Sequence, residues 1–115
     1  MRRICKDQLV REIWDSRSEQ IQSIMTEKGW ISCPYTFENF KQDMMRRELL
    51  VDERTIRTKW ELLVSTGVLR ETAKNRGELA FVAFRDLMPS RSRLILLNLI
   101  EETKTASSHA EKVRA

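Results

Sequence analysis

The sequence predicts an α+β fold that is mainly helical and contains one small β-hairpin. Apolar residues recur at i, i+4 and i+7 in residues 56–63, the spacing of a helix with one buried face. Two short apolar-rich runs, 68–69 and 79–84, flank a polar Lys-Asn-Arg-Gly turn at 74–77, a pattern typical of a hairpin. The 115 residues are enough for one domain, residues 1–115, with a hydrophobic core.

The N-terminal part predicts either two helices or one. Apolar side chains at helical spacing in residues 4–14 indicate a first helix. Ser16 and Glu19 have the spacing of a capping box, which predicts a break at 15–19 and a second helix that ends at Gly29. One continuous helix through residue 28 is the alternative that the pattern leaves open.

A short strand and a capped helix are expected next. Residues 30–33 form an extended run that Pro34 stops, which is compatible with a brief edge strand. Thr36 is suited to cap a helix that carries Phe37, Phe40 and Met44 on its inner side and continues to residue 50.

The following helix has the clearest signals in the chain. Residues 51–52 form a tight connection, Asp52 is a good N-cap, and Gly67 is a plausible stop, so residues 53–66 should be helical. Ile56, Trp60 and Leu63 then face the core. After Pro89 the chain predicts a helix over 91–104 and a polar tail over 105–115 that frays.

Composition argues against several classes of protein. Two cysteines and one histidine give no metal-ligand cluster, and neither a phosphate-binding loop nor a nucleophile motif is present, so we expect no enzyme activity, cofactor or metal. No secretory signal opens the chain, and no apolar run approaches the roughly 18 residues that span a bilayer. The expected location is intracellular, in the cytoplasm or on the nucleoid.

Positive charge is concentrated in one segment. From Arg54 to Arg76 there are six basic and two acidic residues, and this difference of +4 equals the net charge of the whole chain. A local positive field attracts phosphates, although it also fits acidic proteins or membranes.

The predicted order of elements over residues 16–84 resembles the winged helix-turn-helix family of DNA-binding domains. The likeness is carried by the turn at 51–52, the helix ERTIRTKWELLVSTG (53–67) and the run VLRE (68–71) that leads into the basic turn. The resemblance implies that helix 53–66 lies in the major groove of DNA and that hairpin 68–84 is a wing that touches backbone or minor groove.

The helical register assigns expected roles to the polar residues of this region. On the outer face of helix 53–66, Arg54, Thr55 and Thr58 are candidate readers of base edges. The candidate phosphate contacts are Arg57 and Lys59 on the flanks of that helix, Lys74 and Arg76 on the wing, and Arg46 and Arg47 on the preceding helix. The alternative is that these cations are only the solvated face of an amphipathic helix.

Residues 94–100 are apolar nearly all round, so a helix there should be buried on more than one side. We expect a homodimer in which this helix and the N-terminal helix, residues 4–14, pack against their symmetry mates. The core would then be residues 16–84, and the flanking segments 1–15 and 89–104 would form the dimer interface. A central strand or a helix buried within one subunit is the alternative.

The expected function is sequence-specific binding of double-stranded DNA in transcription regulation. The rivals are a winged-helix protein-interaction module and a DNA-binding accessory protein of replication, a plasmid or a virus.

Overall fold

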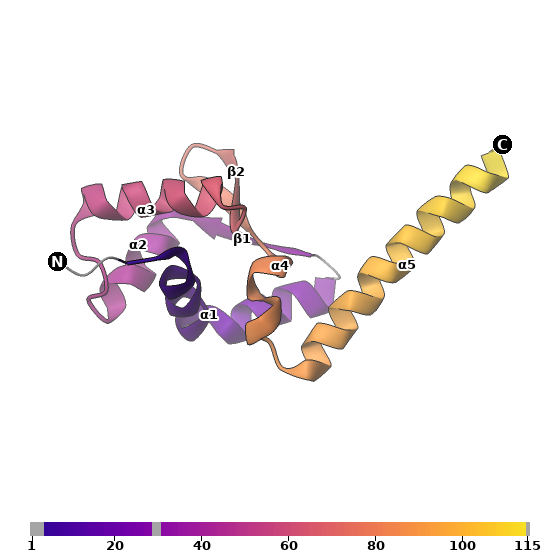
Figure 1. Ribbon diagram of the computed structural model, residues 1–115, viewed down its shortest axis with the longest axis horizontal. Coiled ribbons are helices and arrows are strands. Elements are labelled where there is room, and N and C mark those ends of the chain that lie inside the picture. Colours follow the sequence, from indigo (N-terminus) through magenta and orange to yellow (C-terminus); the bar gives the residue numbers. More distant parts are fainter. Residues whose placement is uncertain (1–3, 29–30, 115) are drawn as a thin grey trace.

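The computed structural model describes residues 4–28 and 31–114, with side chains as far as Glu102, and confirms a mainly helical α+β fold (Figure 1). Its elements in chain order are α1 (Lys6–Lys28), β1 (Ser32–Thr36), α2 (Phe37–Arg46), α3 (Glu53–Ser65), β2 (Leu69–Ala73), β3 (Arg76–Ala80), α4 (Phe81–Phe84), a 3₁₀ turn (Arg85–Leu87) and α5 (Ser90–Arg114). Figure 1 shows a body made of α1 to α4 and the sheet, from which α5 projects.

The three strands form an antiparallel sheet in the order β1-β3-β2. The predicted edge strand is present as β1, but it runs through Pro34 to Thr36 and does not stop at Pro34, contrary to the prediction. At the edge of the sheet, Pro34 can lack a backbone N–H without interrupting a central ladder. The hairpin is shorter than predicted, because residues 81–84 form the helical turn α4 instead of continuing β3. Phe81 and Phe84 are both buried, and a spacing of three places both on one side of a helix but on opposite sides of a strand.

Two of the three predicted N-caps, Thr36 and Asp52, are confirmed, whereas Ser16 lies inside α1 and its hydroxyl accepts a hydrogen bond from Arg46 at 2.7 Å. Thr36 and Asn39 form a reciprocal capping box at the start of α2. The Asp52 carboxylate accepts hydrogen bonds from the backbone N–H and the hydroxyl of Thr55, both at 3.0 Å, and these bonds lower the pKa of Asp52. Gly67 follows the end of α3 with φ +81°, a left-handed conformation that glycine adopts without a Cβ clash.

The connection between α2 and α3 is longer than predicted. Helix α2 ends at Arg46, not near residue 50, because Glu48 adopts a left-handed φ of 57° and ends the helical path. The backbone N–H of Leu50 then bonds the carbonyl of Met44 at 3.2 Å, and the side chain of Leu50 is buried. A six-residue link, 47–52, therefore replaces the two-residue turn.

Helix α1 combines the two alternatives for the N-terminal part. It is one element from Lys6 to Lys28, but Arg17 has non-helical backbone angles (φ −134°, ψ 20°), so the axis is kinked inside the predicted 15–19 break. The Arg17 Nε donates to both oxygens of the Asp43 carboxylate, at 3.0 and 2.7 Å. Asp43 also accepts a hydrogen bond from the Tyr35 hydroxyl at 2.5 Å, so one buried carboxylate ties the kink to β1 and α2.

The core contains an aromatic cluster around Trp60, which is 1% exposed and was predicted as a core residue. The rings of Tyr35, Phe37 and Phe40 have centroids 5.6 to 6.4 Å from one another or from the indole. The indole N–H donates to the Glu71 carboxylate on β2 at 2.8 Å, which joins α3 to the hairpin. Trp30, also predicted as a core residue, lies outside the described residues.

The two segments expected at a dimer interface have different surroundings. Leu9, Val10 and Ile13 on α1 are buried inside the chain, so the apolar face of the N-terminal helix is not available to a second copy, contrary to the prediction. Residues 94–100 are helical as expected but are covered on one side only, with Leu96 buried. Helix α5 also continues to Arg114, past the predicted end near residue 104.

Candidate nucleic-acid interface

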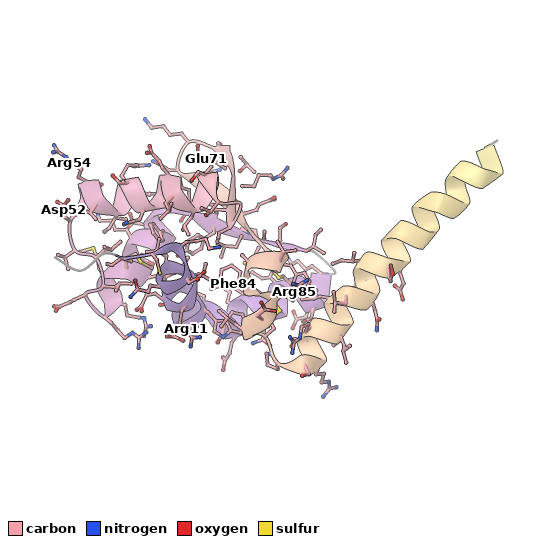
Figure 2. The ribbon with its side chains drawn as sticks, viewed as in Figure 1. Arg11, Asp52, Arg54, Glu71, Phe84 and Arg85 are labelled. Atoms are coloured by element: carbon pink, nitrogen blue, oxygen red, sulfur yellow. The ribbon has the colours of Figure 1, made fainter. Side chains whose placement is uncertain are left out.

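The outer face of α3 carries the three predicted readers in accessible positions. Arg54, Thr55 and Thr58 are all exposed. The guanidinium of Arg54 makes no hydrogen bond or ion pair within the described residues, and Figure 2 shows Arg54 at the N-terminal end of α3, pointing away from the body. The two threonine hydroxyls donate locally, to Asp52 and to the Arg54 carbonyl at 3.0 and 3.1 Å. Each hydroxyl oxygen can still accept a hydrogen bond from outside.

The hairpin presents two further free cations. Lys74 and Arg76 are exposed on either side of Asn75, and neither has a partner in the described part of the chain. Asn75 has a left-handed φ of 64°, which asparagine tolerates in a tight turn. At Gly77 a Cβ would lie 2.8 Å from the Arg70 carbonyl oxygen, so the narrow hairpin requires glycine there.

Arg57 joins α3 to the hairpin tip. Its guanidinium donates a hydrogen bond to Oδ1 of Asn75 at 2.7 Å and lies over the Phe37 ring, 3.7 Å from the centroid. The backbone N–H of Phe37 in turn bonds the Asn75 carbonyl at 2.9 Å. The start of α2, the middle of α3 and the hairpin turn are therefore held together at one point.

Besides Arg57, three more of the predicted phosphate contacts have partners within the chain. Arg47 donates to Glu12 and Asp15 on α1 at 2.8 to 3.0 Å, and these hydrogen bonds raise its pKa. Arg46 donates to Ser16 at 2.7 Å, and Lys59 donates to the Ile4 carbonyl at 3.0 Å. These cations bind the N-terminal helix to α2 and α3, which makes them structural residues in this conformation.

Acidic groups limit the positive surface. Glu61 is exposed one helical turn after the readers and has no partner among the described residues. Glu53 lies 3.8 Å from Lys41, and Arg70 pairs with Glu78 across the hairpin at 2.7 Å. The cations of this region whose side chains have no partner among the described residues are therefore Arg54, Lys74 and Arg76, while Arg57 and Lys59 keep their charge but donate to neutral oxygens.

Asn75 and Phe37 are the residues of the candidate interface whose contacts with Arg57 the sequence reasoning missed. Each had a local explanation, Asn75 as a turn residue and Phe37 as a core residue. Their second role depends on Arg57, which is 18 residues before Asn75 and 20 residues after Phe37. A side-chain contact across that separation leaves no periodic signal in a single sequence.

The described residues contain no cluster of three or more potential metal ligands. Cys5 is exposed and unpaired, and Cys33 is buried; burial raises the pKa of the Cys33 thiol to about 11, which keeps it protonated at neutral pH. Within that same part of the chain, no helix has the length and apolar character needed to cross a bilayer.

Comparisons of the chain with protein-family models, with curated proteins and with solved structures give no match.

Proposed function

We propose that this protein is a winged-helix protein that binds double-stranded DNA, with α3 in the major groove and the β2–β3 hairpin as the wing. The observation that carries the proposal is the contact of Arg57 with Asn75, which holds the reading helix and the hairpin tip in a defined relative position. Arg54 on the helix and Lys74 and Arg76 on the hairpin remain free to meet a ligand.

The arrangement of elements supports this assignment. A helix, an edge strand, two helices and a hairpin follow one another, and the Trp60–Glu71 hydrogen bond joins α3 to the hairpin. In winged-helix domains the helix after the turn enters the groove and the wing follows the backbone. The link of residues 47–52 takes the place of the turn.

Each free group has a matching chemistry on duplex DNA. The planar guanidinium of Arg54 can donate two hydrogen bonds to guanine O6 and N7, and the threonines can contact either polar or methyl groups at base edges. Lys74 and Arg76 suit phosphates or a narrow minor groove. In this proposal, α3 discriminates between base sequences, and the hairpin contributes the salt-dependent part of the affinity.

The character of the surface favours DNA over a protein partner. None of the exposed large hydrophobic residues in the described part of the chain lies on α3, β2 or β3. Surfaces that dock proteins usually expose a contiguous apolar patch, whereas DNA-binding surfaces are polar and cationic. Binding of specific sites would make the protein a transcriptional regulator, located in the compartment that holds the DNA.

Selection of bound sequences from a pool of random duplexes tests the proposal. We expect a defined motif, and Arg54→Ala or Thr58→Ala should reduce discrimination between that motif and a mutated site by about 1–3 kcal/mol. Arg11→Ala is the matched control, because Arg11 is exposed on α1 and lies far from Arg54 in Figure 2. If all duplexes bind equally and no motif is enriched, the protein is a non-specific DNA-binding accessory protein and not a sequence-specific regulator. If no duplex binds, the proposal is refuted.

A further inference from the structure

One face of α5 is exposed and has no cover within the described chain. Among residues 91–102 the exposed positions are 91, 94, 95, 97, 98, 101 and 102, and at 100° per residue they fall within an arc of about 160°. The apolar members are Leu94, Ile95 and Leu97, which are 59, 40 and 37% exposed. The opposite side of the helix contacts the body through buried Leu96 and through a hydrogen bond of 2.8 Å from Ser92 to Gln22 on α1.

Opposite charges lie at the two ends of the apolar part of this face. Arg91 lies one turn before Leu94, and Glu101 and Glu102 lie one turn after Leu97. All three charged side chains are exposed, and none has a partner among the described residues. Suppose that a second α5 packs antiparallel to the first, with residue 96 of one helix level with residue 96 of the other. Arg91 of each helix then lies beside Glu101 and Glu102 of the other.

We propose that the covering partner is a second copy of this chain, packed antiparallel along this face of α5 about a two-fold axis. A two-fold interface must be self-complementary, so that when residue i contacts residue j, residue j contacts residue i. The face meets this condition twice, through two Arg91–acid clusters and through the apolar residues between them. Asn98 lies in the same arc, where a polar residue fixes the register of paired helices.

The projection of α5 leaves room for the partner helix. Figure 1 shows α5 leaving the body at an angle, away from α3 and the hairpin. In such a dimer the outer face of α3 and the hairpin tip of each copy stay exposed, but dimer formation does not depend on DNA binding. Because the interface consists of one helix pair and is smaller than a standard interface of about 1,600 Å², we expect the dimer to have a dissociation constant in the micromolar range.

Sedimentation equilibrium of the full chain without DNA tests the proposal, with circular dichroism to check that each variant is folded. We expect the parent to shift from monomer to dimer over about 1 to 100 µM, and Leu94→Glu to remain monomeric over this range. Arg91→Glu alone, and the pair Glu101→Arg with Glu102→Arg alone, should each weaken the dimer about tenfold. The three changes combined should restore it, because each reversed charge then meets a reversed partner.

Two results would overturn the proposal. One is a parent protein that stays monomeric throughout the concentration range, since the face then serves no second copy. The other is a triple variant whose dimer is no tighter than that of the Arg91→Glu variant, because the charges then do not pair across the two-fold axis. Arg11→Glu, which makes the same change of charge on α1, is the control and should leave the dimer unchanged.

Discussion

The guanidinium of Arg57 and the side-chain amide oxygen of Asn75 lie 2.7 Å apart, and this hydrogen bond connects the middle of α3 to the tip of the hairpin. The Phe37 ring supports the guanidinium from one side at 3.7 Å. The contact fixes the position of Lys74 and Arg76 relative to Arg54. In the proposed function it orders the DNA-binding surface before the ligand arrives, which removes an entropic cost of binding.

Arg57→Ala should weaken DNA binding about tenfold by loosening the hairpin, with little change in the number of phosphates contacted. Fluorescence anisotropy over a series of salt concentrations separates these effects, because the slope of affinity against salt counts phosphate contacts. Arg57→Lys should fall between parent and Arg57→Ala, since an ammonium keeps the charge but not the planar contact with Phe37. A slope reduced by one full contact would show that Arg57 binds phosphate directly.

Glu61→Gln should increase affinity for random duplexes about three- to fivefold at low salt. The exposed Glu61 carboxylate follows the readers by one turn, and a surface charge this close to phosphates opposes binding by roughly 1 kcal/mol, less as salt increases. Glu27→Gln, an equivalent change at an exposed position near the end of α1, should have no effect. Equal gains for both variants would show that only net charge matters and that α3 does not face the DNA.

The parts of the fold that the sequence predicted depend on local signals. The caps Thr36 and Asp52, the stop at Gly67 and the buried face of α3 each arise from residues within a few positions of one another, and all are confirmed. The class of fold follows from them. Periodicity and turn chemistry need no knowledge of the rest of the chain.

The parts that the sequence did not predict depend on contacts between distant residues. The kink of α1 at Arg17 is joined by a hydrogen bond to Asp43, which lies 26 residues further along the chain. The sequence predicted Arg46 and Arg47 as phosphate contacts, but in the structure they donate hydrogen bonds to Glu12, Asp15 and Ser16 on α1. Which basic residues are free for DNA is therefore a tertiary property, and it reduces the candidate set to Arg54, Lys74 and Arg76.

Asp43→Ala should be the more destabilising of two changes in the buried cluster. It leaves the Arg17 guanidinium without its carboxylate in a site where the Arg17 and Asp43 side chains are 18 and 5% exposed, which should cost about 3–5 kcal/mol. Tyr35→Phe removes only one hydrogen bond to that carboxylate and should cost about 1.5–3 kcal/mol. Urea unfolding followed by circular dichroism measures both, and equal losses would show that the ion pair does not stabilise the kink.

The salt dependence of duplex binding is the most direct test of the central claim. Replacing both Lys74 and Arg76 with alanine should reduce the slope of log affinity against log salt by about 2, because each phosphate contact contributes about 0.9. The double control Arg11→Ala with Arg85→Ala removes two exposed arginines away from α3 and the hairpin tip (Figure 2) and should keep the slope of the parent. A parent that binds no duplex at low salt, or a wing variant whose slope equals that of the parent, would contradict the account.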